Sequence, residues 1–158
     1  MAKGKKKIAP GDVATNRQAR FRYELLEKWE AGLILEGSEV KALREGGAHL
    51  RDSYATVTDG EVWLHKVHIP PYQPASRENH DPDRSRKLLL HRREIDRLVG
   101  RTHERGLTLV PTRLYFSGPH AKVEIALARG KDLHDKRHAI KDREQKREMD
   151  RALSDARR

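Results

Sequence analysis

The stretch SYATVTDGEVWLHKVHI, residues 53–69, decides the fold class of this chain. Asp59-Gly60 separates two runs, Ser53–Thr58 and Glu61–Ile69, which are both rich in Val, Thr, Tyr and Trp. Such residues favour strands, and an Asp-Gly pair between two strands is typical of a tight hairpin turn. Pro70-Pro71 ends the second run, because proline has no N–H to donate to a sheet. The stretch therefore predicts an antiparallel hairpin.

A second hairpin is predicted further along the chain. Gly106 precedes the strand Leu107–Phe116, and Ser117-Gly118-Pro119-His120 connects that strand to Ala121–Leu127. The whole chain then holds about five or six strands. A small antiparallel sheet loses its exposed edges by closing, and the regular crossover helices of a parallel sheet are missing from the pattern. We predict a closed antiparallel β-barrel with about three inserted helices.

Two short helices are predicted before the first hairpin. One covers about Asn16–Phe21. The run Tyr23–Leu35 fits both a helical spacing and the alternation of a strand, and periodicity alone leaves the choice open. Gly37 and Ser38 then open a helix at Glu39–Arg44, with Ser38 as the residue that caps its first turn.

A longer helix is predicted at Arg84–Val99, with Asp83 as its N-cap and Gly100 as its end. Its apolar face consists of Leu88, Leu89, Ile95, Leu98 and Val99. Positive charge is concentrated on this helix and just beyond it, at Arg84, Arg86, Lys87, Arg92, Arg93, Arg97, Arg101 and Arg105. Guanidinium groups bind phosphate in a bidentate manner, so this helix is a candidate for RNA binding.

The overall composition favours a polyanionic partner. The 158 residues are 35% hydrophobic and 37% charged, and the net charge is +10. Each Lys or Arg that neutralises a phosphate releases condensed counterions, which makes RNA a suitable partner. A membrane is disfavoured, because no stretch approaches the roughly 20 apolar residues of a span. For any single arginine, a solvated helix face explains the charge equally well.

The absence of cysteine excludes disulfides and cysteine-based zinc sites. Nothing in the sequence suggests secretion, so we expect a cytoplasmic protein. The serines lack a nucleophile-elbow motif, no glycine-rich phosphate loop is present, and the nine histidines lack metal-ligand spacing. We therefore expect no catalytic residue, metal or cofactor. A magnesium-dependent RNA nuclease that uses Asp52, Asp81, Asp83 and Glu94 remains the enzyme alternative.

The two ends of the chain differ from its middle. Residues 1–11 contain four lysines before Pro10-Gly11 and are predicted to form a flexible basic arm, whereas residues 12–128 form the barrel domain. Residues 129–158 hold eleven Lys or Arg, seven Asp or Glu and few apolar side chains. Such a segment buries too little surface to offset its ordering entropy. We predict a tail that is disordered when free and helical when bound.

Seven short motifs between residues 12 and 145 resemble the small protein B family. Each motif is weak alone, but all seven occur in order and with intact spacing. They are Asn16-Arg17-Gln18-Ala19-Arg20, Glu30-Ala31-Gly32, Gly37-Ser38-Glu39-Val40-Lys41, Asp52-Ser53-Tyr54, Arg86-Lys87-Leu88-Leu89-Leu90, Gly106-Leu107-Thr108-Leu109-Val110-Pro111, and Gly130-Lys131 followed by Asp135-Lys136-Arg137.

The resemblance implies an oligonucleotide-binding-type (OB-fold) barrel and a strand over Tyr23–Leu35. It also implies a non-catalytic adaptor of trans-translation, which binds the tRNA-like domain of transfer-messenger RNA (SsrA RNA) and brings it to stalled ribosomes. The implied partners are this RNA and the ribosome, with elongation factor Tu and alanyl-tRNA synthetase contacted indirectly through the RNA. We expect a monomer. A ribosomal or ribosome-assembly protein remains the alternative among RNA-binding proteins.

The same resemblance places an RNA face around seven residues, which are Asn16, Arg17, Arg20, Tyr23, Glu30, Lys87 and Leu89. Glu30 is the informative one, because a carboxylate is unexpected opposite RNA. It can accept a hydrogen bond from a base or ribose, or it can be a strand residue paired with a neighbouring Lys or Arg. Leu89 can contact RNA or belong to the core, and both alternatives stay open.

In the tail, the resemblance places one group of residues at the ribosomal decoding centre. These are Gly130, Lys131, His134, Asp135, Lys136 and Arg137. The segment beyond them is implied to form a helix in the empty mRNA channel, against small-subunit rRNA. Asp132 stands where the family often has a lysine. Either that position tolerates variation, or Asp132 pairs with Lys136 to support the helix.

Overall fold

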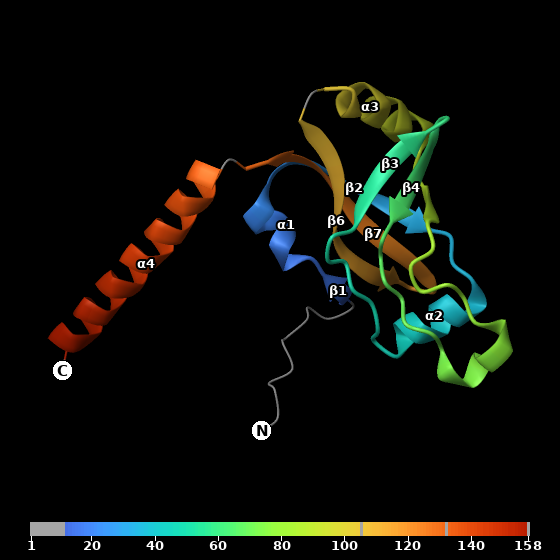
Figure 1. The fold of residues 1–158 in the computed structure, drawn as a ribbon, viewed down its shortest axis with the longest axis horizontal. Helices are drawn as coiled ribbons and strands as arrows, with labels where there is room; N and C mark the ends of the chain where they lie inside the picture. The colour runs from blue at the N-terminus through green and yellow to red at the C-terminus, as the bar shows by residue number, and fades with distance from the viewer. Residues whose placement is uncertain (1–11, 105, 132, 158) are drawn as a thin grey trace.

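A computed structural model describes residues 12–104, 106–131 and 133–157 (Figure 1). The predicted basic arm, residues 1–11, lies outside the described residues. Seven strands form one antiparallel sheet. They are β1 (Asp12–Thr15), β2 (Tyr23–Leu33), β3 (Tyr54–Thr58), β4 (Glu61–His65), β5 (Arg86–Leu89), β6 (Leu107–Ser117) and β7 (His120–Gly130).

The sheet closes on itself. Its strand order is β1-β6-β3-β4-β5-β2-β7, and β7 pairs again with β6. Six strands, β2 to β7, therefore form a continuous hydrogen-bonded ring, which we call the strand ring, and β1 is added outside it on β6. Figure 1 shows β3 and β4 on one side of this ring and β2 and β7 on the opposite side. The predicted closure of an antiparallel sheet is confirmed, but the predicted number of strands was too low.

The described residues also form four α-helices and one 3₁₀ helix. They are α1 (Arg17–Arg22), α2 (Gly37–Arg44), η1 (Gln73–Glu78), α3 (Arg92–Thr102) and α4 (Leu133–Ala156). Residues 23–33 form a strand rather than a helix, as the resemblance implied. Within the described residues, no helix is long and apolar enough to span a membrane.

Both predicted hairpins are confirmed. β3 and β4 pair from Tyr54 opposite His65 to Thr58 opposite Glu61. Asp59 and Gly60 between them have φ values of 52° and 74°. Two positive φ values in a two-residue loop define the primed turn that an Asp-Gly pair favours. β6 and β7 form the longer hairpin and pair along their whole lengths.

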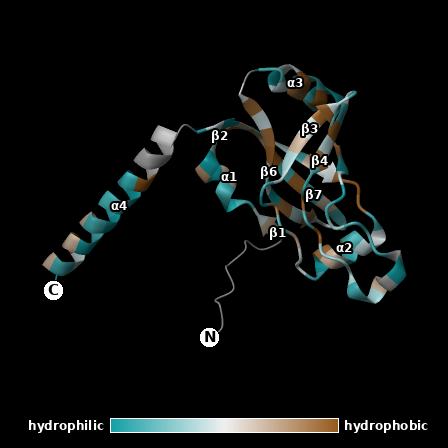
Figure 2. Ribbon diagram, viewed as in Figure 1, coloured by the Kyte–Doolittle hydropathy of each residue, from teal (hydrophilic) through white to brown (hydrophobic). Residues whose placement is uncertain are grey.

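The interior of the strand ring is the hydrophobic core. Buried residues alternate with exposed ones along the strands, so that Trp29 and Ala31 are buried while Glu30 between them is exposed. Figure 2 shows apolar residues concentrated on the strands and polar residues covering most of α4. A second, smaller cluster lies outside the ring and holds α1 against β6 and β7; it consists of Ala19, Val110, Ala126 and Ala128.

The predicted helix Arg84–Val99 is wrong, because two elements share this stretch. Its first part is the strand β5, in which buried Arg86 and Leu88 alternate with Lys87 and Leu89. The helix α3 begins only at Arg92, and it continues past Gly100 to Thr102. The run of leucines at 88–90 concealed the change from the spacing of a strand to that of a helix. Asp83 caps no helix and instead lies 3.0 Å from the ring nitrogen Nδ1 of His68.

The caps of α2 and α3 also differ from the prediction. Glu36 precedes α2, and the Glu39 side chain accepts a hydrogen bond from the Glu36 backbone N–H at 2.9 Å. Ser38 is therefore not the N-cap, and its hydroxyl instead lies 2.9 Å from Nδ1 of His80. At α3, His91 and Glu94 make the equivalent reciprocal pair. A glutamate three residues after the cap is the shared feature of both helices.

A buried ion triad joins α2 to the strand ring. The Glu39 and Arg86 side chains are both 0% exposed and form an ion pair, and Arg84 donates to Glu39 from Nε at 3.1 Å. Arg86 also donates to the backbone oxygens of Val67 and Pro82 at 2.7 and 3.1 Å. Arg84 and Arg86, which were predicted to contribute to a basic RNA-binding helix, are thus used in holding the fold together.

The triad predicts a loss of stability in acid. Burial raises the pKa of Glu39, but hydrogen bonds from the Glu36 backbone, Arg84 and Arg86 outweigh it and leave the pKa below 4.5. A lowered folded-state pKa contributes stability above the unfolded pKa, and this contribution is lost as the pH falls through the folded value. We expect the unfolding free energy of wild type to fall more steeply below pH 4.5 than that of Glu39→Gln, measured by urea titration at each pH. Equal slopes would contradict this assignment.

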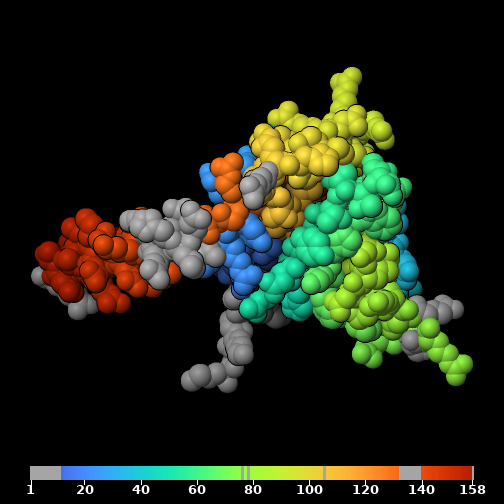
Figure 3. All heavy atoms as spheres, turned by 45° about the horizontal axis from the view of Figure 1, so that its top comes forward, coloured from blue at the N-terminus to red at the C-terminus, as the bar shows by residue number. Residues whose placement is uncertain are grey.

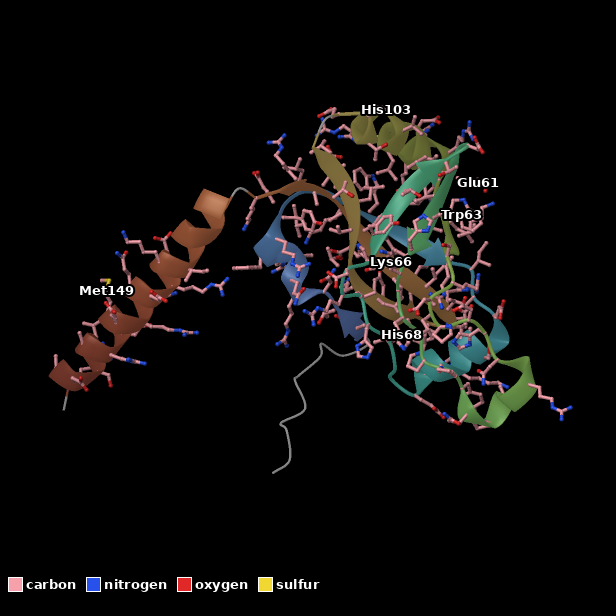
Figure 4. All side chains as sticks on the ribbon, viewed as in Figure 1. Glu61, Trp63, Lys66, His68, His103 and Met149 are labelled. Atoms are coloured by element: carbon pink, nitrogen blue, oxygen red, sulfur yellow. The ribbon has the colours of Figure 1, made fainter. Side chains whose placement is uncertain are left out.

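The tail helix α4 stands apart from the strand ring. Figures 1 and 3 show it projecting from the end of β7 into solvent. Its large apolar side chains from Ile140 onward are exposed, including Met149 at 66% (Figure 4) and Leu153 at 57%. One contact with the body of the protein is made by Arg143, which lies 5.8 Å from the centre of the Phe21 ring in α1. The predicted helical tendency agrees with this helix, and disorder in the free protein stays a prediction.

Candidate nucleic-acid interface

The first part of the candidate interface is organised by α1. The Asn16 side chain donates to the backbone oxygen of Pro111 at 2.9 Å, and the Asn16 backbone N–H donates to the backbone oxygen of Thr112 at 2.7 Å. Asn16 therefore fixes the start of α1 against β6. Arg17 and Arg20 on α1 are exposed, and the described part of the chain gives neither of them an ion pair. These two guanidinium groups are available for phosphate.

A hollow of about 410 Å³ lies beside these arginines, between α1 and β6. We call it the α1 hollow; it is lined by Asp12, Thr15, Asn16, Arg17, Arg20, Thr112, Arg113 and Glu124. Tyr23, at the start of β2, is half-buried and borders a smaller hollow of about 230 Å³ on the other flank of α1. Three predicted residues thus lie around a single short helix, with Tyr23 directly after it.

Glu30 and Leu89 meet at a second site on neighbouring strands. They line a groove of about 590 Å³, which we call the β2–β5 groove, with Gly32, Leu33, Leu90, His91, Glu94, His120, Ala121 and Lys122. Leu89 is 54% exposed and pairs with Gly32, so it does not belong to the core. A Cβ at Gly32 would lie 3.2 Å from that of Leu89, and glycine therefore allows this close approach.

Lys87 lies two residues before Leu89 and faces the same side of β5, because strand side chains alternate between faces. Its Nζ atom donates to the carboxylate of Glu61 at 2.8 Å. Glu61 lies at the start of β4 (Figure 4), so the charge of Lys87 is partly neutralised in the free protein. Lys122, which the sequence-based prediction did not include, borders the groove on the side of β7.

A polar network joins the groove to the α1 hollow. The hydroxyl of Tyr115 on β6 donates to the carboxylate of Glu30. Arg113, two residues earlier on the same face, lies 4.3 Å from the centre of the Tyr115 ring. Arg113 also donates to Glu124 at 3.0 Å and to Asp12 at 3.1 Å. Among the described residues, Glu30 is therefore bound by a tyrosine and not by the neighbouring Lys or Arg of one alternative, and its contact with RNA stays a prediction.

The protonation states in this network follow from its contacts. Burial raises the pKa of Tyr115 to about 12, with the hydrogen bond to Glu30 acting in the same direction. The phenol is therefore a donor at neutral pH. Burial raises the pKa of Glu124, but hydrogen bonds from Thr112 and Arg113 outweigh it and lower the pKa overall. The sequence offered one indication of this network, namely polar residues at alternate positions of a strand that otherwise contributes to the core.

The arginines of α3 are divided among several ion pairs. Arg97 binds Glu27 through two hydrogen bonds of 3.0 and 2.9 Å, and the bond from Arg97 lowers the pKa of Glu27. Arg101 pairs with Glu104 at 2.9 Å, and Arg92 lies 3.4 Å from Asp96. Fewer of these arginines are therefore free to bind phosphate than the sequence predicted. Arg105 lies outside the described residues.

The predicted decoding-centre residues begin at the end of β7. Gly130 is the last residue of that strand and pairs with Tyr23. The backbone N–H of Lys131 donates to the backbone oxygen of Arg22 at 3.0 Å. The Nζ atom of Lys131 donates to the backbone oxygen of Arg20, also at 3.0 Å. Lys131 thus joins the start of the tail to α1. The backbone of α4 includes His134, Asp135, Lys136 and Arg137, whose side chains lie outside the description, as does Asp132.

The carboxylates of the enzyme alternative are each engaged in other contacts of the fold. Asp52 pairs with Arg22 at 2.8 Å, Asp83 lies against His68, and Glu94 caps α3. Asp81 accepts the backbone N–H of Asp83 at 3.0 Å. Over the described ranges, no group of three or more His, Asp or Glu side chains is placed to share a metal ion.

The fold and this surface define a class: a small antiparallel β protein whose outer face offers free arginines, a carboxylate acceptor and an exposed leucine. A family model described as SmpB protein matches residues 13–155. The chain belongs to the SmpB protein family.

Individual relatives agree with this assignment. The SsrA-binding protein of Frankia casuarinae is 56% identical over 141 residues, which cover 89% of each chain. The SsrA-binding protein of a Sulfurihydrogenibium species is 54% identical over 89% of this chain and 93% of its own. A solved structure described as "tmRNA-SmpB: a journey to the center of the bacterial ribosome" contains a chain with a TM-score of 0.66 and 47% identity, covering 80% of this chain and 93% of that one.

Proposed function

We propose that this protein is a non-catalytic adaptor that binds the tRNA-like domain of transfer-messenger RNA and delivers it to stalled ribosomes. The observation that supports it best is the Tyr115–Arg113 network, which links the α1 hollow to Glu30 in the β2–β5 groove. Free arginines at one end suit phosphates, and a carboxylate at the other suits a base or ribose donor. The names of the relatives describe proteins that bind this RNA.

The proposal includes an assignment of the fold as an oligonucleotide-binding-type barrel. The closed strand ring with helices between its strands supports it. Residues 12–128 would form this domain, and residues 129–158 would form the tail. Barrels of this type bind nucleic acid on their outer strand face and adjacent loops. The candidate interface lies on the outer face of β2, β5, β6 and β7 in the same manner.

In this proposal, the seven residues of the RNA face have different roles. Arg17, Arg20 and Lys87 bind phosphates, and Glu30 accepts a hydrogen bond from a base or a 2′-hydroxyl. Leu89 packs against a base or sugar, Tyr23 borders the contact surface, and Asn16 holds α1 in position. These assignments follow from exposure and hydrogen bonding: Asn16 is occupied by β6, whereas Leu89 and the two arginines are open to solvent.

The tail is proposed to act on the ribosome. Gly130, Lys131, His134, Asp135, Lys136 and Arg137 would lie at the decoding centre, and the rest of α4 would occupy the empty mRNA channel. The eleven Lys or Arg of residues 129–158 suit a channel lined by rRNA phosphate. The protein would act as a cytoplasmic monomer, and it would contact elongation factor Tu and alanyl-tRNA synthetase only through the RNA.

Removal of single cations from the RNA face should reduce the salt dependence of binding. Arg17→Ala and Lys87→Ala are each expected to weaken binding and to lower the slope of log K against log salt by about one unit at most. The change should be smaller for Lys87, because Glu61 already pairs with it. Filter binding over a series of salt concentrations measures both slopes. Unchanged slopes would place these side chains away from phosphate.

The proposed function is tested by competition. Purified protein is bound to the tRNA-like domain of transfer-messenger RNA at moderate salt, with ordinary tRNA as competitor. Preferential binding of the tRNA-like domain is expected. Equal binding of both RNAs would show that charge alone drives association, and it would favour a ribosome-associated protein instead.

A further inference from the structure

The carboxylate of Glu30 is held from one side only. Tyr115 donates to one of its oxygens, and within the described residues no other hydrogen bond or ion pair reaches the Glu30 side chain. Glu30 is exposed and borders the β2–β5 groove beside Gly32 and Leu89. One carboxylate oxygen is therefore fixed by the protein, while the other remains an open acceptor at the edge of the groove.

Tyr115 is itself held in place. Its ring lies under the guanidinium group of Arg113, 4.3 Å from the ring centre. Arg113 is fixed in turn by Asp12 on β1 and by Glu124 on β7, and Glu124 accepts a further bond from the Thr112 hydroxyl at 2.9 Å. A guanidinium group held by two carboxylates has little freedom to move. The Tyr115 hydroxyl thus reaches Glu30 from a rigid support.

We propose that Tyr115 is a positioning residue that determines RNA specificity, by fixing the Glu30 carboxylate as a hydrogen-bond acceptor for a base amine or a 2′-hydroxyl. This inference rests on the proposed function. A carboxylate repels phosphate, so a rigid one excludes helical RNA backbone from the groove and admits only RNA that presents a donor at this point. A mobile carboxylate could rotate away and would exclude little.

The arrangement also couples the two halves of the interface. Arg113 borders the α1 hollow beside Arg17 and Arg20. Tyr115 donates a hydrogen bond to Glu30, which lines the β2–β5 groove. The distance between phosphate-binding arginines and the acceptor is thereby set by two residues of one strand. A folded RNA that matches this spacing is favoured over RNA that merely carries charge.

A double-mutant cycle tests the proposal. Wild type, Tyr115→Phe, Glu30→Ala and the double variant are compared for binding to the tRNA-like domain of transfer-messenger RNA and to ordinary tRNA. Tyr115→Phe is expected to weaken binding to the tRNA-like domain about fivefold, and to change binding less than about twofold in the Glu30→Ala background. Binding to ordinary tRNA should not weaken, because a carboxylate that can rotate away excludes RNA backbone less than a fixed one.

Two further measurements separate positioning from a loss of structure. Tyr115→Phe keeps the ring under Arg113 and removes no cation, so the salt slope of binding should stay as in wild type while affinity falls. Tyr72→Phe is the matched control, since its hydroxyl has no hydrogen bond among the described residues and its ring lies near Lys41, at 5.7 Å. Tyr72→Phe should bind like wild type, and both phenylalanine variants should unfold at similar temperatures.

The possible failures are distinct. If wild type binds both RNAs equally, the proposed function and this inference are both wrong. If wild type prefers the tRNA-like domain but Tyr115→Phe weakens binding by the same factor with and without Glu30, then Tyr115 acts independently of the carboxylate and the inference alone is overturned. The same holds if Tyr115→Phe and Tyr72→Phe bind equally well.

Discussion

Deletion of residues 134–158 is expected to abolish peptide tagging on stalled ribosomes while leaving affinity for the tRNA-like domain within about twofold of wild type. The cut falls after Lys131, so both hydrogen bonds from Lys131 to α1 are kept. The α1 hollow and the β2–β5 groove contain no residue beyond Glu124. The deletion therefore removes the proposed ribosome-binding helix and spares the RNA face.

Tagging is measured in reconstituted translation of a message without a stop codon, beside RNA binding of the same preparations. A proline substitution separates helix formation from charge. Gln145→Pro leaves the net charge unchanged and costs about 3 kcal/mol in a helix interior, and Gln145→Ala is its control. Tagging should fall with proline and persist with alanine. A large loss of RNA affinity on deletion would show instead that the tail belongs to the RNA site.

Replacement of Glu39 by alanine is expected to destabilise the fold by about 3–5 kcal/mol, the usual cost of removing one partner from a buried ion pair. The change leaves the Arg86 guanidinium, which is 0% exposed, without a counter-ion, and it also releases Arg84. Since folded domains are stable by only about 5–15 kcal/mol, such a variant would be marginally folded. The free energy of unfolding is measured by urea denaturation.

A neighbouring glutamate provides the control for this prediction. Glu45, at the end of α2, is exposed and has no ion pair in the described part of the chain, so Glu45→Ala should change stability by less than about 0.5 kcal/mol. Glu39→Gln keeps the shape and one acceptor, and its effect should lie between the two. If Glu39→Ala and Glu45→Ala were equally stable, the buried triad would not contribute to the fold.

The parts of the fold that the sequence predicted are those determined locally. The Asp59-Gly60 turn and the β6–β7 hairpin depend on residues close together in the chain, and both were predicted. The stretch 84–99 was assigned to one helix because the apolar residues of β5 and α3 together mimic a helical period. The inward position of Arg86 could not be predicted, since its partner Glu39 lies 47 residues away.

The candidate site shows the same limit. Its residues were identified by resemblance, and the fold places Glu30 and Leu89 in one groove and Arg17 and Arg20 beside another hollow. The exposure of Leu89 answers a question that periodicity left open. Tyr115 was missed because its contact with Glu30 spans 85 residues, and a tyrosine in a strand gives no sign of its partner.

The closure of the strand ring also determines when the protein can fold during its own synthesis. β2 pairs with β7 over nearly its whole length, from Tyr23 opposite Gly130 to Gly32 opposite Lys122. Contacts between segments so far apart in sequence make folding slow and require an almost complete chain. The second apolar cluster under α1 likewise needs Ala126 and Ala128. A nascent chain that stops before β7 would therefore have neither half of the proposed RNA face, so incomplete copies could not compete with finished protein for the RNA.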